Sequence, residues 1–398
     1  MKSILFAVTL LTIVCACNLS STKEKAKETE DSMNYYPPTP GKLDRQLFRD
    51  YYRRIDALMD SVLPDRVFSG GVLVARDGEI IYEKYNGFAD QQKTIPLTDS
   101  TAFHLASASK PFTGVAILRL IQENKISLDD SLQKFFPLLP YPGITVKMLL
   151  NHRSGLPNYI YFISNSKNWD QAKYVNNQDV MDFMYREKPE ATKPDTHFSY
   201  SNTNYVLLAM IVEKVSGKPF PVFMQEKFFG PLLMSKSYVF TYADSARSVP
   251  SFNYNGSLWQ NDFLELTYGD KNIYSTPRDM LKWDQALYTG QVIRQSLLDS
   301  AYTAYSNERR SFHNYGLGFR LLNLENGKKV IYHFGRWHGF NAAFSRLPDE
   351  KATIIILGNK FNRNIYNAAV RCYPIFGGSA GESQEEDAEE NGVGQGKK

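Results

Sequence analysis

Two stretches with the alternating pattern of β-hairpins lie towards opposite ends of the chain, and they constrain the fold more than any other feature. Residues 70–82 form the first, with Asp77-Gly78 as a tight turn. Towards the other end, residues 332–347 and 352–357 are predicted to be strands joined by a Pro-Asp-Glu turn. Strands joined by tight turns pair antiparallel, so we expect a sheet built from both ends of the chain.

Segments with helical spacing lie between these strands. Residues 47–62, 111–123 and 204–215 repeat apolar side chains at helical intervals, and Gly217 is suited to end the last of them. The sequence therefore predicts an α/β fold with an antiparallel sheet flanked by helices. A mostly helical lobe, at about residues 106–260, is expected to be inserted between the strands of this sheet.

The folded domain is expected to cover residues 44–375, between two segments of different composition. Residues 17–43 are rich in Ser, Thr, Lys, Glu and Pro and lack periodic apolar residues, which is typical of a flexible tether. Residues 376–398 are predicted to be a disordered acidic tail, with a net charge of 2 − 6 = −4. Since the whole chain carries +4, the rest carries about +8, which scattered solvated lysines explain more simply than a site for an anionic surface. No nucleic-acid partner is expected.

The first 16 residues have the composition of an export signal. Lys2 precedes an apolar run over residues 4–14, and small residues follow it. A permanent membrane-spanning helix needs about 20 apolar residues, and this run is shorter. Residues 1–16 are therefore predicted to be a signal peptide.

The end of this signal, Val14-Cys15-Ala16-Cys17, resembles a lipobox, the bacterial motif in which a cysteine is acylated and becomes the first residue of the mature chain. The resemblance implies lipid attachment at Cys17 and a protein anchored to the bacterial cell envelope by its lipid alone, with the outer membrane and periplasm as the expected location. An ordinary signal peptide with incidental cysteines is the alternative. The chain has three cysteines, and Cys372 would be left without a partner, so no disulfide framework is expected.

Ser107-Ala108-Ser109-Lys110 is a Ser-x-x-Lys sequence whose context favours catalysis. The spacing alone is weak, since Ser20, Ser131 and Ser164 also have a lysine three residues on. Pro111 and an apolar helical run follow only here, so we expect Ser107 at a helix N-terminus and Lys110 one turn on, on the same face. A lysine whose pKa is lowered by burial is able to take the proton of a serine hydroxyl, which is otherwise a poor nucleophile. A serine that merely caps the helix is the alternative.

The segment from His104 to Thr113 resembles the nucleophile segment of class C β-lactamases and of related D-alanyl-D-alanine carboxypeptidases and esterases. Residues 149–156 resemble the family's Leu-Leu-x-His-x-Ser-Gly-Leu stretch, which is structural there, so His152 is expected to be buried and hydrogen-bonded. The resemblance extends over about residues 45–373. It implies a β-lactamase/transpeptidase-like fold.

Tyr200-Ser201-Asn202, just before a predicted helix, matches the family's Tyr-x-Asn motif. The resemblance implies that Tyr200 moves a proton between nucleophile and leaving group, and that Asn202 hydrogen-bonds the amide of the substrate. A phenol beside a cationic lysine has its pKa drawn down from about 10, which suits a proton relay. A tyrosine that only joins the two lobes is the alternative.

His333-Phe334-Gly335 stands where the family has Lys-Thr-Gly or His-Thr-Gly on the strand that lines the cleft. The resemblance implies substrate-binding roles for His333, Gly335 and Arg336. It also implies an oxyanion hole formed by the backbone N–H groups of Ser107 and Arg336.

Phe334 departs from the family pattern, because it lacks the hydroxyl that threonine offers to a substrate carboxylate. Leaving a carboxylate without that partner costs roughly 1–3 kcal/mol. Activity on β-lactams and on D-alanyl peptides is therefore in question. Either Arg336 or His338 supplies a replacement charge, or the site prefers a neutral ester or amide.

Two classes of function follow from these motifs. The first is a serine hydrolase in which Ser107 forms an acyl-enzyme and Lys110 and Tyr200 move protons, with D-amino-acid peptides of the cell wall, β-lactams or small esters as substrates. The second is a non-catalytic module that binds or senses cell-wall fragments in a retained cleft. No cofactor and no metal are expected, since the six histidines show no His-Glu-x-x-His spacing.

Overall fold

The computed structural model describes residues 39–378, with gaps at 309–310 and 325. These residues belong to one compact unit. The predicted signal peptide, Cys17, and most of the predicted tether and acidic tail lie outside them. Those predictions, and the boundaries drawn from them, stay predictions.

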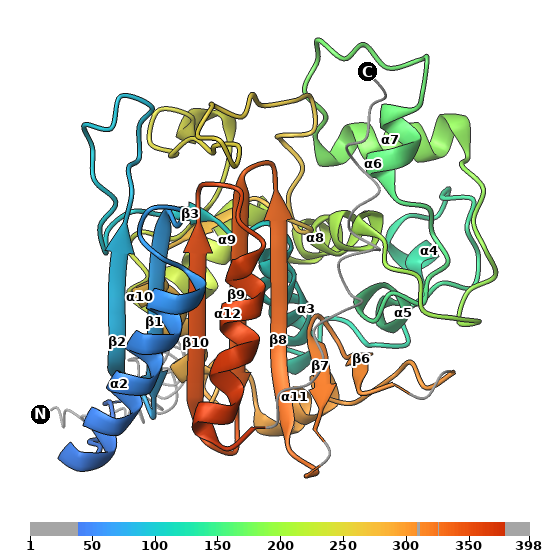
Figure 1. Cartoon of the computed structure of the whole chain (residues 1–398). Helices are drawn as coiled ribbons and strands as arrows, with labels where there is room; N and C mark the ends of the chain where they lie inside the picture. Colours follow the sequence, from blue (N-terminus) through green and yellow to red (C-terminus); the bar gives the residue numbers. More distant parts are fainter. Residues whose placement is uncertain (1–38, 309–310, 325, 379–398) are drawn as a thin grey trace, which may run out of the picture. The chain divides into compact units, whose positions relative to one another are not determined.

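A seven-stranded antiparallel sheet joins the two ends of the described chain (Figure 1). In spatial order its strands are β2 (Glu79–Asn86), β1 (Gly70–Arg76), β10 (Ala352–Gly358), β9 (Phe340–Leu347), β8 (Lys329–Trp337), β7 (Arg320–Asn323) and β6 (His313–Tyr315). The β1 strand pairs with β10 from Gly70 opposite Gly358 to Arg76 opposite Ala352. The predicted sheet from both ends of the chain is thus confirmed.

Helices cover both faces of this sheet, which explains why β1 and β10 are buried along almost their whole length. On one face lie α2 (Arg45–Val62) and α12 (Asn364–Cys372), as Figure 1 shows. The α2 helix turns Tyr51, Ile55 and Met59 inward at four-residue intervals. On the opposite face, α10 (Pro277–Ala286) packs against β1 and β10.

The chain between β3 and α10 is mostly helical, and this confirms the predicted fold class. Its helices are α3 (Lys110–Gln122), α4 (Leu132–Phe135), α5 (Val146–Leu150), α6 (Tyr159–Ser164), α7 (Asn177–Glu187), α8 (Asn202–Ser216) and α9 (Phe220–Met224). A small sheet of β3 (Phe103–His104), β5 (Ile273–Ser275) and β4 (Tyr238–Val239) joins this part to the main sheet, and α11 (Gln295–Ala301) leads back to β6. As predicted, α8 ends at Gly217, which has a left-handed φ of 71°.

One expected strand is in fact two. Residues 332–347 contain the end of β8 and all of β9, which pair antiparallel with Trp337 opposite Phe340. Between them His338 adopts a left-handed φ of 52°, and Gly339 follows. The turn was hidden because aromatic residues, Trp337 and Phe340, flank it in place of the Asn, Asp, Ser or Pro that usually mark one.

A buried ion pair fixes α10 on the sheet. Arg346 of β9 donates to Asp284 of α10 at 2.7 Å, and the Thr353 hydroxyl donates to the other carboxylate oxygen at 2.6 Å. Both charged side chains are almost completely buried. Because removing one partner of such a pair typically costs about 3–5 kcal/mol, this contact holds the helix in register with the strands.

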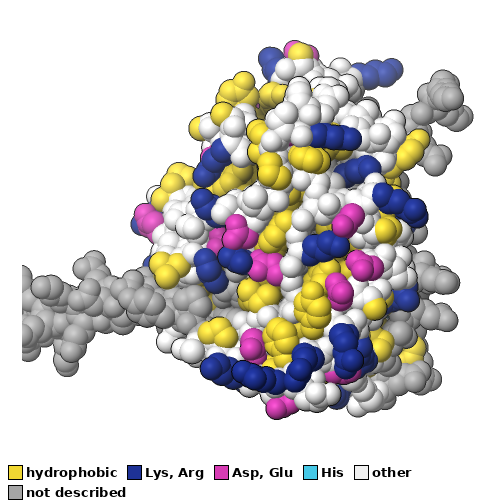
Figure 2. Space-filling model, turned by 60° about the vertical axis from the view of Figure 1, so that its left-hand side comes forward, with side chains coloured by type: hydrophobic (Ala, Val, Ile, Leu, Met, Phe, Trp, Pro, Cys, Tyr) yellow, Lys and Arg dark blue, Asp and Glu magenta, His cyan; other side chains and the backbone are white. Residues whose placement is uncertain are grey.

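The outer surface on the β2 side mixes charges of both signs. Figure 2 shows Lys and Arg side chains beside Asp and Glu side chains over much of this face, with small apolar patches between them. Within the described part of the chain, every helix is too short or too polar to cross a bilayer.

Candidate active site

Ser107 lies in a tight 3₁₀ turn, Ala106–Ser109, between β3 and α3. Ala106 enters the turn with a left-handed φ of 49°, and its N–H donates to His104 Nδ1 at 2.9 Å. The turn is tied to β5 from the other side, since the N–H of Ile273 donates to Ser109 Oγ at 3.1 Å. Ser107 therefore precedes α3 by one short turn, and Ser109, not Ser107, is the N-cap residue of that helix.

Lys110 is completely buried and brings three segments together at Ser107. Its Nζ donates to Ser107 Oγ at 3.1 Å, to Asn202 Oδ1 at 2.7 Å and to the backbone carbonyl of Asp270 at 2.9 Å. The predicted placement of amine and hydroxyl on one helical face is confirmed. The distance between them is short enough for direct proton transfer.

Tyr200 and Asn202 reach this point from the start of α8. The Lys110 amine lies 4.9 Å from the centre of the Tyr200 ring. His152 holds the segment in place: its Nδ1 accepts from the N–H of Ser201 at 3.2 Å, and its ring lies 4.3 Å from the Tyr200 ring. His152 is fully buried, as predicted, and its role is to position the tyrosine.

The β8 strand lies directly against the nucleophile turn at Gly335. A Cβ at this position would lie 2.3 Å from the carbonyl oxygen of Leu105 and 2.8 Å from the backbone nitrogen of Ser107. Only glycine allows so close an approach. It brings the backbone of residue 336 beside that of Ser107, the placement that the predicted oxyanion hole requires.

His333 is fully buried behind this contact, with both ring nitrogens engaged. Its Nδ1 donates to its neighbour's carbonyl, Phe334 O, at 2.7 Å, and its Nε2 accepts from the Tyr315 hydroxyl at 3.0 Å. Burial, with the charges of Arg320 and Lys110, holds the pKa of His333 well below its ordinary value. His333 is therefore a neutral group next to the catalytic residues.

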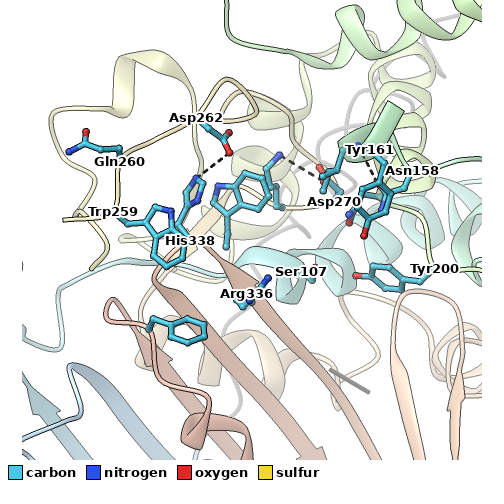
Figure 3. A pocket seen from close by; sticks show the side chains of 15 residues that line it. Ser107, Asn158, Tyr161, Tyr200, Trp259, Gln260, Asp262, Asp270, Arg336 and His338 are labelled. Atoms are coloured by element: carbon cyan, nitrogen blue, oxygen red, sulfur yellow. Dashed lines mark hydrogen bonds and ion pairs between the residues drawn. The ribbon is translucent and has the colours of Figure 1, made fainter. Parts of the chain in front are cut away.

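A cavity of about 480 Å³ opens above Ser107 (Figure 3). Of the residues predicted from sequence, Ser107, Tyr200, Asn202 and Arg336 line it. Lys110, His333 and Gly335 do not line it but lie buried beneath its floor. Direct contact of His333 or Gly335 with a substrate stays a prediction.

Phe334 does not face the cavity, which corrects the expectation drawn from its missing hydroxyl. Its ring stacks on Tyr366 at 5.2 Å and lies 5.0 Å from Tyr332, on the side of the sheet covered by α2 and α12. The Phe334 side chain packs against the hydrophobic core between the sheet and these helices. Arg336, by contrast, lines the cavity, lies beside Ser107 in Figure 3 and is a cationic group available to a substrate carboxylate there.

Most of the residues that line the cavity were not predicted from the sequence. It comprises the aromatic residues Tyr161, Trp259, Trp337 and Phe361, the polar residues Asn158 and Gln260, and the charged residues Asp262, Asp270 and Lys271. They come from α6, from the end of β8 and from several loops, so no single spacing or motif joins them. The aromatic and charged side chains together suit a polar acyl group with an apolar portion.

His338 also lines the cavity, and Glu265 engages it. Its Nε2 lies 2.5 Å from Glu265 Oε1, and Asp262 approaches to 4.0 Å. Burial alone would raise the pKa of Glu265, but hydrogen bonding to His338 lowers it below its ordinary value. In the described chain these three are grouped closely enough to hold a metal ion, but the Glu265–His338 contact explains the grouping without one.

A serine that lines a cavity and contacts a buried lysine beside a tyrosine is the arrangement of an acyl-transferring serine hydrolase. Comparison with known proteins agrees. A family model described as Beta-lactamase matches residues 53–370. The chain is 31% identical over 336 residues to "Penicillin-binding protein 4*" of Bacillus subtilis (strain 168). The aligned region covers 80% of this chain and 74% of that protein.

Solved structures share the fold. The octameric penicillin-binding protein homologue from Pyrococcus abyssi matches with a TM-score of 0.69 and 25% identity, over 81% of this chain and 76% of that one. The D-amino acid amidase from Ochrobactrum anthropi SV3, complexed with L-phenylalanine amide, matches with a TM-score of 0.65 and 23% identity, over 81% and 97%. The chain therefore belongs to the β-lactamase family and is a serine hydrolase of the penicillin-binding-protein type.

Proposed function

We propose that the protein is an exported, lipid-anchored hydrolase that cleaves an amide or ester bond through an acyl-enzyme on Ser107. The observation that carries this proposal is the 3.1 Å contact between Lys110 Nζ and Ser107 Oγ at the floor of the cavity. Tyr200 and Asn202 border the same point. A module that only binds cell-wall fragments has no use for a nucleophile held against a buried amine.

In the proposed reaction, Ser107 Oγ attacks the substrate carbonyl as its proton passes to Lys110. The negative oxygen that forms is held by the backbone N–H groups of residues 107 and 336. Tyr200 then delivers a proton to the leaving nitrogen or oxygen as its bond to the carbonyl carbon breaks, and Lys110 passes the serine's proton on to Tyr200. Water attacks the remaining ester, its proton returns through Lys110 and Tyr200, and the acid and free Ser107 are released.

We infer that the preferred substrates are D-amino-acid peptides or amides. The amidase that shares this fold is described as acting on a D-amino acid amide, and the cavity combines aromatic walls with the Arg336 guanidinium. An arginine binds a carboxylate with charge-assisted hydrogen bonds. Substrates with a carboxylate near the scissile bond should therefore be favoured, in spite of the phenylalanine at 334.

Replacing Arg336 with alanine should separate these substrates. For a D-Ala-D-Ala peptide and for a chromogenic cephalosporin, kcat/KM should fall about tenfold or more further than kcat/KM for a short-chain nitrophenyl ester. A charge-assisted hydrogen bond contributes about 1.5–3 kcal/mol, and only the first two substrates carry a carboxylate. Lys329→Ala, at the exposed far end of the same strand, is the control and should leave the ratio unchanged. An equal loss on all three substrates would show that Arg336 does not read the carboxylate.

Lipid anchoring at Cys17 is a separate part of the proposal. In a bacterial host given a labelled fatty acid, the full chain should incorporate label and sediment with membranes. The Cys17→Ser variant should lose both properties, because only the cysteine thiol accepts the lipid. Cys372→Ser is the matched control, since Cys372 is buried in the core and should not be acylated. Label retained in Cys17→Ser would remove the anchor from the proposal.

A further inference from the structure

Asp270, whose backbone carbonyl accepts from the Lys110 amine, has a carboxylate side chain, which is unusual at a buried position. Asp270 is 1% exposed, and its carboxylate Oδ2 accepts from the Tyr159 hydroxyl at 2.8 Å. The adjacent Lys271 is 3% exposed, and its Nζ donates to the same Tyr159 oxygen at 2.7 Å and to Thr267 Oγ1. The two charges approach to 3.9 Å, so Tyr159 bridges a buried ion pair next to the catalytic lysine.

Tyr159 also ties this pair to the segment that carries the rest of the site. It is the first residue of α6, and its backbone N–H donates to Thr203 Oγ1 at 2.8 Å, one residue after Asn202. Asn202 in turn accepts from Lys110. The network therefore closes a ring around the Lys110 amine, from the Asp270 carbonyl through Tyr159 to α8.

We propose that Asp270 is a positioning residue for Lys110, locked by Tyr159 and Lys271, and that this charge pair tunes the pH range in which the lysine works. The inference rests on the proposed role of Lys110 as the base. Burying two charges is costly, and such a pair does not by itself stabilise a fold. The pair adjoins the Asp270 carbonyl that accepts from the Lys110 amine, and this gives it a function that an apolar pair of the same volume would not supply.

The geometric part is tested by Tyr159→Phe. Tyr159 is buried and does not line the cavity, so the substrate does not touch it. Without the hydroxyl, the Asp270 carboxylate and the Lys271 amine lose their common partner, and the carbonyl that orients Lys110 is less fixed. The kcat for a nitrophenyl ester should fall about tenfold while KM stays within about twofold, since small misplacements of catalytic groups carry costs of this order.

Tyr373→Phe is the matched control. Its hydroxyl is buried and forms a 2.8 Å hydrogen bond with Ser345 in the main sheet, away from Lys110. Both variants lose a buried tyrosine hydroxyl, and Tyr159→Phe should lose more thermal stability because its hydroxyl contacts both Asp270 and Lys271. A kcat loss equal in the two variants, or none in Tyr159→Phe, would overturn the positioning role.

The electrostatic part predicts opposite shifts of the pH profile. The acid limb of kcat/KM reports the group that must lose a proton. We take that group to be Lys110. Lys271→Met removes a nearby positive charge, which makes protonation of Lys110 easier, so the acid limb should move to higher pH. Asp270→Asn removes a negative charge and should move the acid limb to lower pH. Each of the two shifts should be at least about half a pH unit. The double variant should return close to the wild-type profile at a reduced rate.

Other ionisable groups near these residues are unchanged in all of these variants. Lys110 faces Tyr200, Tyr205, His152, His333 and Arg320, and Lys271 faces Tyr159, Asp262 and Glu265. Burial lowers the pKa of Lys271, and the surrounding carboxylates oppose that shift.

Shifts in the same direction, or no shift in either single variant, would overturn the electrostatic role. A wild-type enzyme without Ser107-dependent activity would instead contradict the proposed function, so the two failures are distinguishable.

Discussion

Replacing Ser107 with alanine should lower kcat for every hydrolysed substrate by at least about a thousandfold, because loss of a nucleophile removes the acyl-enzyme route altogether. The Ser107 hydroxyl is the only group of the turn that both lines the cavity and contacts Lys110. Its removal leaves cavity shape, charge and the lysine in place. Ester hydrolysis under saturating substrate measures the effect directly.

Ser109→Ala is the control within the same turn. Ser109 Oγ accepts a backbone hydrogen bond from Ile273 and does not line the cavity, so this variant should lose stability but retain most of kcat. A fluorescent phosphonate or penicillin probe adds an independent measurement. Labelling should occur in the wild type and in Ser109→Ala and vanish in Ser107→Ala. Failure of every acylating probe to label the wild type would favour the cell-wall binding module instead.

The fold was predictable because its signals are local. A hairpin turn at Asp77-Gly78, helical spacing in α2, α3 and α8, and apolar strands at both ends each follow from short-range preferences. The turn at His338 was missed because a left-handed histidine between aromatic residues has no local turn marker. Tertiary contacts set that turn: Gly339 donates to Ser251 Oγ from a distant loop.

The residues of the candidate active site were predictable for a different reason. Ser107 and Lys110 share one helical face, and Asn202 begins a helix, so motif and local structure agree. The direction of the Phe334 side chain was not predictable in this way. Strand alternation places it with Tyr332 on the core side, and the motif alone does not say which face of β8 meets the cavity.

The network around Asp270 shows what sequence analysis cannot supply. An Asp-Lys pair in a polar loop is usually a solvated pair, and nothing in residues 267–271 marks it as buried. Burial arises because α6 places Tyr159 over it and α8 closes the other side. Such a site depends on the assembly of three distant segments, and only their contacts reveal it.

Removing the Lys110 side chain should lower kcat by at least about a hundredfold, the low end for the loss of a general base. In Lys110→Ala, Ser107 keeps its place in the turn, but no amine lies near its hydroxyl to take the proton. The remaining rate should also lose its acid limb, because the titrating group is gone. Rates measured from pH 5 to 10 on a nitrophenyl ester test both expectations.

Lys110→Arg separates proton transfer from charge. A guanidinium keeps the positive charge but does not give up its proton in a protein, so this variant should be about as inactive as Lys110→Ala. Lys147→Ala, at a half-buried lysine on α5 that does not line the cavity, should leave the rate unchanged. If Lys110→Arg kept most of the activity, the lysine would act only as a fixed charge, and Tyr200 would have to be the base. Tyr200 is close enough to be this alternative base, since its ring centre lies 4.9 Å from the Lys110 amine. Loss of the remaining activity on adding Tyr200→Phe to the Lys110→Arg variant would identify Tyr200 as the base.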